Sequence, residues 1–169
     1  WDFDAITINA FSGLKSIEPF TENPEKSIFI WCRASNDGAE ELQDVIVSNP
    51  QNEVPYFQLL AELANQSNRN NNVGLVVGAN SPKQLSKVRS ICPGMPILIP
   101  GIGAQGGDLK SSIEAGLDAK HHSIVINSSR GIIYSPTSIK NFNKEISIAT
   151  EELNSLINVS LNQLGRAWG

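Results

Sequence analysis

The stretch Leu98-Ile99-Pro100-Gly101-Ile102-Gly103-Ala104-Gln105-Gly106-Gly107-Asp108 decides the fold of this chain. An apolar run leads directly into a loop that contains four glycines. Asp108 is then placed to cap a helix that ends at Gly116. A buried strand, a glycine-rich turn and a helix in succession are the parts of a parallel βα unit. The sequence around this unit must therefore show whether others follow the same plan.

The glycine loop also matches the spacing of a dinucleotide-binding motif, because Gly101, Gly103 and Gly106 spell G-x-G-x-x-G. Such a site needs an acidic residue at the end of the following strand to hold the ribose hydroxyls. The next apolar run ends in Asn127-Ser128-Ser129-Arg130, which contains no carboxylate. The sequence therefore disfavours a dinucleotide site. A different phosphate site and a simple tight turn both remain open.

Five short apolar runs have the composition of buried strands, and helical patterns separate them. The runs span residues 4–9, 27–32, 73–79, 96–100 and 123–127. Strands that are apolar throughout and alternate with helices are typical of a parallel sheet covered by helices, so the predicted class is α/β. Two architectures compete, an open doubly wound sheet and part of a (β/α)8 barrel.

Helix signals occupy the segments between these runs. Residues from Ala39 to about Val47 are predicted to be helical, and apolar residues recur at helical spacing from Phe57 to Ala64. Ser81-Pro82 opens a helix that runs to about Cys92. A long amphipathic helix closes the chain, and its apolar stripe is predicted to be a core face. The stripe consists of Ile139, Phe142, Ile146, Ala149, Leu153 and Leu156.

Composition excludes several classes of function. The formal net charge is −4 and no basic run is present, which argues against a nucleic-acid partner. No apolar run reaches the length of a membrane span, so no membrane contact is expected. The two cysteines, Cys32 and Cys92, lie in apolar segments and are predicted to be reduced, buried thiols of a cytoplasmic protein. No C-x-x-C pair is present, so the sequence does not support a zinc or redox motif.

Two loops that follow the last two predicted strands contain groups that bind phosphate. The loop 101–107 offers glycine amides and the side-chain amide of Gln105. The loop 127–131 offers Arg130, whose planar guanidinium suits phosphate. Barrel enzymes often bind phosphate with the loops after their last two strands. Taken alone, the first loop could be a simple glycine turn and Arg130 in the second a surface arginine. Together, the two loops predict a phosphate site in a barrel.

A closed barrel needs eight strands and about 250 residues, whereas this chain of 169 residues offers five predicted strands. We therefore expect residues 1–169 to form one partial barrel domain, the C-terminal five βα units of a (β/α)8 TIM barrel. The sequence begins at Trp1 rather than at a methionine, and a predicted strand follows almost at once. Both features agree with an origin in a longer polypeptide. A missing N-terminal segment or another chain would then complete the barrel.

The paired loops resemble those of orotidine 5′-phosphate decarboxylases, in the longer subgroup found in many bacteria and in malaria-type parasites. Residues 100–108 carry the resemblance together with 127–132, and 4–9, 33–36 and 73–80 agree with it. The resemblance implies conversion of orotidine 5′-phosphate (OMP) to UMP and CO2 in pyrimidine biosynthesis. It also implies a cytoplasmic homodimer that uses no cofactor. Ala34 and Asp37 depart from the residues common in relatives, which are Thr and Pro.

The resemblance also implies roles for individual residues. Ser35 would hydrogen-bond the pyrimidine ring and Pro100 would pack near the base. From the sequence alone, Ser35 could instead cap a helix before Ala39. The residues that would hold the 5′-phosphate are Gln105, Arg130, Ser129 and Gly103, with the backbone amides of Ser129 and Arg130 assisting.

The chemistry of that family depends on an Asp-x-Lys-x-x-Asp motif and a further Asp–Lys pair. Asp108-Leu109-Lys110 has the first half of the motif only, because Ile113 stands where the second aspartate is required. The resemblance therefore places the proton donor outside this chain, in the N-terminal three-eighths of the barrel, and no catalytic residue is assigned here. The alternative, from a different class of function, is a non-catalytic barrel module that binds a phosphate or a nucleotide such as UMP.

Overall fold

A computed structural model describes residues 2–48, 52–103, 105–136 and 138–168. Trp1 and Ala104, which the sequence analysis mentions, lie outside the described residues. The strands are β1 (Ala5–Ile8), β2 (Ser27–Arg33), β3 (Ile46–Ser48), β4 (Glu53–Pro55), β5 (Val73–Val77), β6 (Ile97–Pro100) and β7 (Ile124–Asn127). The α-helices are α1 (Glu18–Thr21), α2 (Glu40–Gln43), α3 (Tyr56–Ser67), α4 (Pro82–Ile91), α5 (Leu109–Gly116), α6 (Ser129–Ile133) and α7 (Phe142–Gln163), with short 3-10 turns η1 (Leu14–Ile17) and η2 (Ile139–Asn141).

Five strands form one parallel sheet in the order β1-β2-β5-β6-β7. Apart from the β3–β4 hairpin, each strand lies beside the one that precedes it in the chain. A doubly wound sheet reverses its direction of growth at a switch point, and no reversal occurs among the described strands. This constant direction is the arrangement found in an arc of a (β/α)8 barrel. The predicted parallel α/β sheet is confirmed, with strands at all five predicted positions.

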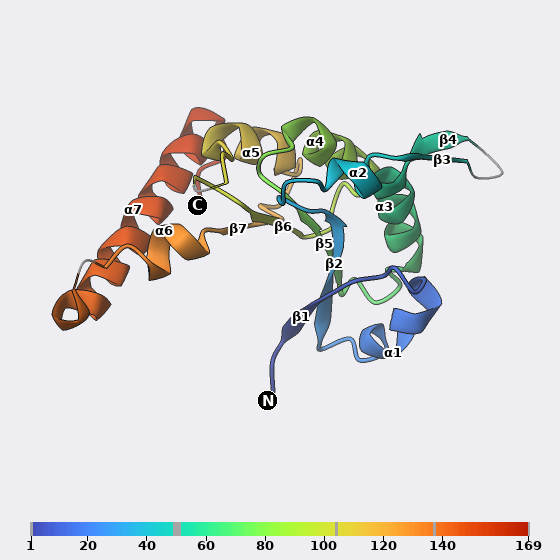
Figure 1. Cartoon of the computed structure of the whole chain (residues 1–169), viewed down its shortest axis with the longest axis horizontal. Coiled ribbons are helices and arrows are strands. Elements are labelled where there is room, and N and C mark those ends of the chain that lie inside the picture. Colours follow the sequence, from blue (N-terminus) through green and yellow to red (C-terminus); the bar gives the residue numbers. More distant parts are fainter. Residues whose placement is uncertain (1, 49–51, 104, 137, 169) are drawn as a thin grey trace.

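The helices α3, α4 and α5 follow one another along one side of the sheet, and α7 lies beyond them near β7 (Figure 1). Side chains from the sheet and these helices form the core between the two layers. The β-branched residues of the strands suit this pleated, buried surface. The most deeply buried members are Ile28, Ile30, Leu75, Val77, Ile97 and Ile99 from the strands, and Leu85, Val88 and Ile113 from the helices.

The opposite face of the sheet is also apolar but largely open. The strand register aligns Trp31, Val76, Leu98 and Val125 in one row across four strands. Trp31 at one end of the row is 48% exposed and Val125 at the other is 49% exposed. Among the described residues, β1 and β7 each pair with a neighbouring strand on one side only. An apolar row between two unpaired edges is what the interior of an incomplete barrel presents.

Two helical predictions differ from the structure. The helix expected from Ala39 to about Val47 ends at Gln43, and Ile46 begins the hairpin strand β3. Three β-branched residues in a row, Val45 to Val47, favour a strand over a helix. The apolar stripe of the last helix is only partly covered, because Ile139 in η2 is 94% exposed and Leu156 is 56% exposed. The other half of the stripe is half-buried and consists of Ile146, Ala149 and Leu153.

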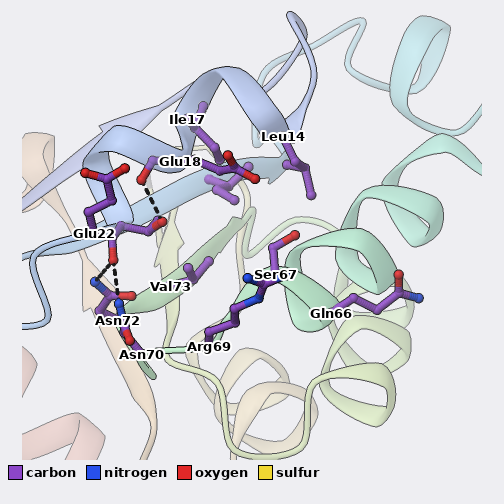
Figure 2. Close-up of a pocket in the computed structure, with 12 residues that line it drawn as sticks. Leu14, Ile17, Glu18, Glu22, Gln66, Ser67, Arg69, Asn70, Asn72 and Val73 are labelled. Carbon is purple, nitrogen blue, oxygen red and sulfur yellow. Dashed lines mark hydrogen bonds between the residues drawn. The ribbon is translucent and has the colours of Figure 1, made fainter.

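A cavity of about 510 Å³ lies beside the start of β5, at the opposite end of the strands from the glycine loop. Asn72 borders it and is buried (Figure 2). The Asn72 amide nitrogen donates to the carbonyl oxygens of Thr21, Asn23 and Lys26 at 3.0, 3.1 and 2.9 Å. Asn72 therefore fastens the loop after α1 to the sheet.

Arg89 is a buried cation that joins α4 to the segments around it. The guanidinium donates to the carbonyl oxygens of Gly116 at 2.6 Å, Cys92 at 2.9 Å, Met95 at 2.7 Å and Ser123 at 2.8 Å. Burial lowers the pKa of Arg89, and the nearby Asp118 carboxylate and Cys92 oppose that shift. Four carbonyl groups thus depend on one side chain.

Replacing Arg89 by leucine is expected to lower the free energy of unfolding by about 3–5 kcal/mol, because buried carbonyl groups lose their donors. Urea unfolding of the barrel-completed polypeptide, followed by circular dichroism, measures the loss. Lys87→Leu is the control, since Lys87 lies exposed on the same helix. Equal unfolding midpoints for the two variants would contradict the structural role of Arg89.

Candidate functional site

A cavity of about 350 Å³ opens at the carboxyl ends of β6 and β7. Its volume is in the range of small-molecule sites. The cavity brings together Gln105, Ser129, Arg130 and Pro100, four of the predicted site residues, whereas Gly103 and Ser35 lie outside its lining. The lining residues are Pro100, Gly101, Ile102, Gln105, Asn127, Ser128, Ser129 and Arg130.

The glycine loop turns through left-handed backbone conformations. The φ angles are 96° at Gly101, 72° at Gly103 and 79° at Gly106, where side chains other than glycine's are strained. Gly103 donates its amide hydrogen to the carbonyl oxygen of Gly107 at 3.0 Å, and Gly106 donates to Gly103 at 2.8 Å. The Gly103 amide is therefore engaged within the loop in this conformation. Its contribution here is the turn itself.

Asp108 ends the loop and begins α5, as predicted. Its side chain accepts a hydrogen bond from the backbone amide of Ser111 at 2.8 Å. That bond, with the Ser111 hydroxyl and Lys110 assisting, lowers the pKa of Asp108. A cap that remains ionised fixes the exit of the loop against the helix.

Ser35 reaches the glycine loop from the end of β2. Its hydroxyl donates to the side-chain oxygen of Gln105 at 3.0 Å, although 70 residues separate the two in the chain. Ser35 does not cap α2, because the capping position is Ala39 and makes no side-chain bond. The bond occupies the Gln105 oxygen, so the two N–H groups of that amide are the end left to meet a ligand.

Arg130 and Ser129 lie at the start of α6 on the other side of the cavity. Arg130 is exposed and forms no ion pair with the described residues. The Ser129 hydroxyl donates to the Asn127 side-chain oxygen at 3.3 Å. Asn127 is thus a lining residue to which the sequence analysis gave no role. Its place at the end of an apolar strand was the available signal.

The cavity can bind an anion but holds no proton donor for chemistry. Its lining includes a guanidinium, amides and hydroxyls, and none of the described lining residues is an acid, a lysine or a histidine. Cys32 near the end of β2 offers no nucleophile either. It is buried, donates to the carbonyl of Phe57, and burial raises the pKa of its thiol far above the ordinary value. Both cysteines are free and buried, as predicted.

The described residues contain no group of three or more His, Cys, Asp or Glu side chains placed to hold a metal ion. In the part of the chain that is described, no helix combines the length and apolarity needed to cross a membrane.

Comparison with known proteins identifies a family. Residues 1–144 match the family model described as orotidine 5′-phosphate decarboxylase / HUMPS family. The chain is similar to the orotidine 5′-phosphate decarboxylase of Halorubrum lacusprofundi, with 46% identity over 135 residues that cover 78% of this chain and 48% of the relative. It is 40% identical to that of Dehalococcoides mccartyi over 157 residues, which cover 93% of this chain and 58% of the relative.

The fold agrees with the sequence comparison. The structure of Leishmania donovani OMP decarboxylase superimposes with a TM-score of 0.79 at 36% identity, covering 93% of this chain and 57% of that chain. The five parallel strands and their order therefore confirm the predicted βα units of a (β/α)8 barrel. The chain spans about half the length of the curated relatives that it matches.

Proposed function

The chain belongs to the orotidine 5′-phosphate decarboxylase / HUMPS family, and on that premise we propose that it is the nucleotide-binding part of an OMP decarboxylase. The enzyme converts OMP to UMP and CO2 in the cytoplasm. One observation carries the proposal. Gln105 and Arg130 face the same cavity at the carboxyl ends of adjacent strands, and Gln105 is hydrogen-bonded to Ser35.

Arg130 and Gln105 bind the 5′-phosphate of the nucleotide. The exposed guanidinium forms charge-assisted hydrogen bonds to two phosphate oxygens, and the Gln105 amide donates to another. The Ser129 hydroxyl and the backbone amides of Ser129 and Arg130 complete the phosphate shell, while Gly103 provides the turn that brings Gln105 to it.

Ser35 and Pro100 recognise the base. Ser35 is 8% exposed and sits at the end of β2, so its backbone and hydroxyl present fixed polar groups to a pyrimidine ring. Pro100 ends β6 on the cavity wall and offers a flat apolar surface. The Ser35–Gln105 bond joins base recognition to the phosphate grip. Binding energy from the phosphate then helps to position the ring that reacts.

Residues 1–169 form a partial barrel domain, the C-terminal five βα units, and strands outside this chain complete it. Those strands carry the lysine and aspartates that stabilise and protonate the carbanion left at ring carbon six when CO2 departs. This division agrees with a cavity whose described lining holds no acid or lysine. The complete enzyme works as a homodimer and needs neither a metal nor an organic cofactor.

Turnover of OMP by the polypeptide that contains this chain and its remaining barrel strands tests the proposal. Decarboxylation, followed as loss of OMP absorbance, is expected, together with binding of UMP by calorimetry. Tight UMP binding without any lyase activity would support the alternative, a non-catalytic nucleotide-binding barrel. Absence of UMP binding would overturn both interpretations.

A further inference from the structure

Three backbone groups around Ser35 are each hydrogen-bonded to a side chain from a different segment. The Ala34 amide donates to the side-chain oxygen of Gln43 at 2.7 Å, and the Ala34 carbonyl accepts from Arg33 at 2.8 Å. The Ser35 carbonyl accepts from the amide nitrogen of Asn80 at 3.1 Å. These bonds fix the peptide planes on both sides of the Ser35 α-carbon.

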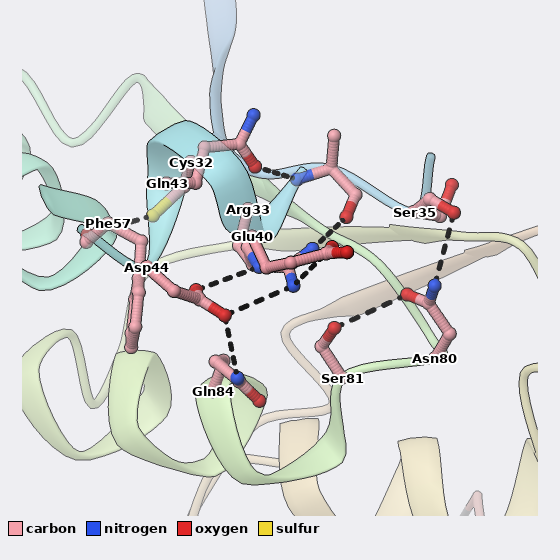
Figure 3. A network of polar contacts seen from close by, with 11 residues as sticks. Cys32, Arg33, Ser35, Glu40, Gln43, Asp44, Phe57, Asn80, Ser81 and Gln84 are labelled. Carbon is pink, nitrogen blue, oxygen red and sulfur yellow. Dashed lines mark hydrogen bonds and ion pairs between the residues drawn. The ribbon is translucent and has the colours of Figure 1, made fainter. Parts of the chain in front are cut away.

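Arg33 and Asp44 form an ion pair that anchors this network (Figure 3). Arg33 is 5% exposed and donates to both oxygens of Asp44, at 3.0 and 3.2 Å. Gln84 on α4 donates to the same carboxylate at 3.3 Å, and Glu40 lies 3.7 Å from the guanidinium. A paired, buried cation of this kind has little freedom to move. The Arg33 guanidinium that donates to the Ala34 carbonyl is therefore itself fixed in place.

Two glycines let the neighbouring loops approach Ser35 closely. A β-carbon added to Gly78 would lie 2.7 Å from the Ser35 α-carbon, and one added to Gly101 would lie 2.9 Å from the Ser35 β-carbon. A real β-carbon essentially never lies this close to a non-bonded heavy atom, so only glycine fits at either position. Ser35 is thereby wedged between the loops that follow β5 and β6.

We propose that Gln43 and Asn80 are positioning residues that set recognition of the pyrimidine base by holding Ser35 in place. The inference rests on the proposed function, because it requires that Ser35 contact the base. Neither residue lines the phosphate cavity. Their effect therefore passes through the Ala34–Ser35 backbone. Loss of either residue weakens recognition of the base directly and reaches the phosphate only through the Ser35–Gln105 bond, while the contacts of Arg130 and Ser129 do not depend on Ser35.

Paired ligands separate this role from a general structural one. UMP carries base and phosphate, whereas ribose 5-phosphate lacks the base. Gln43→Ala removes the acceptor of the Ala34 amide and is expected to weaken UMP binding about 3–10-fold, the effect of one lost hydrogen bond. Affinity for ribose 5-phosphate should fall less than affinity for UMP, because Arg130 and Ser129 still bind the phosphate. Calorimetry of both ligands with the barrel-completed polypeptide measures the ratio.

Matched variants sharpen the test. Gln43→Glu keeps an acceptor at the same place and is expected to restore the wild-type ratio, while Glu41→Ala on the same helix is the control. Asn80→Asp keeps the size and the contact with Ser81 but loses the donor to Ser35, and it should lower UMP affinity more than affinity for ribose 5-phosphate.

An equal loss for both ligands, or no loss for UMP, overturns the inference. The proposed function is tested separately, by the affinities of the wild-type protein for UMP and ribose 5-phosphate before any substitution is made. A wild-type protein that binds UMP and ribose 5-phosphate equally tightly has no base contact at Ser35, and the inference then fails with that assignment.

Discussion

Substituting alanine for both Arg130 and Gln105 is expected to weaken UMP binding by about 100- to 10,000-fold. Hydrogen bonds to a charged group contribute about 1.5–3 kcal/mol each, and the pair provides at least two of them. Because the phosphate lies several bonds from the reacting carbon, the loss should lower kcat/KM for OMP by a comparable factor. Calorimetry with UMP and steady-state kinetics with OMP measure the two effects.

Two single substitutions are the controls for this double substitution. Lys83→Ala removes an exposed cation at a separate site on α4, and it should leave both quantities unchanged. Arg130→Lys keeps the charge but loses the planar fork, so an intermediate loss is expected. Normal turnover by the double variant would show that Gln105 and Arg130 do not bind the phosphate.

The sequence predicted the sheet well because the information is local. Runs such as 73–77 are apolar and β-branched throughout, and a parallel strand buried on both faces has that composition. The paired loops after the last two strands favoured a barrel, and the constant direction of the strand order agrees with it. The hairpin near Ile46 and the exposed face of α7 were missed. There the outcome depends on which other elements pack nearby, and a periodic pattern does not show that.

The site was predicted in part for a similar reason. Gln105 and Arg130 stand in loops with recognisable composition, so their types and spacing were informative. The Ser35–Gln105 bond joins residues 70 positions apart, and the Gln43 and Asn80 contacts with the backbone around Ser35 depend on the approach of separate loops. No local pattern encodes such contacts. A buried arginine at the end of an apolar strand, Arg33, was the only signal that a network lay there.

The isolated 169-residue chain is expected to decarboxylate no OMP and to behave as a poorly soluble or molten species. Two unpaired edges, β1 and β7, invite pairing between copies. The row from Trp31 to Val125 leaves apolar surface uncovered on the inner face. Strong binding of a hydrophobic dye, a broad thermal transition and aggregation that increases with concentration should follow. Joining the chain to its remaining barrel strands should reverse all three and restore turnover.

One substitution distinguishes this explanation from ordinary instability. Val125→Lys places a charge on the exposed inner face, so in the isolated chain it should reduce dye binding and aggregation. In the completed barrel the same position becomes interior, and an unpaired buried lysine costs several kcal/mol, so the variant should unfold readily. The substitution improves the behaviour of the isolated chain and destabilises the completed barrel only if the row from Trp31 to Val125 becomes the barrel interior. A sharp, cooperative melt of the isolated chain at low concentration would contradict the whole account, because a closed and self-sufficient core would then have to exist within these residues.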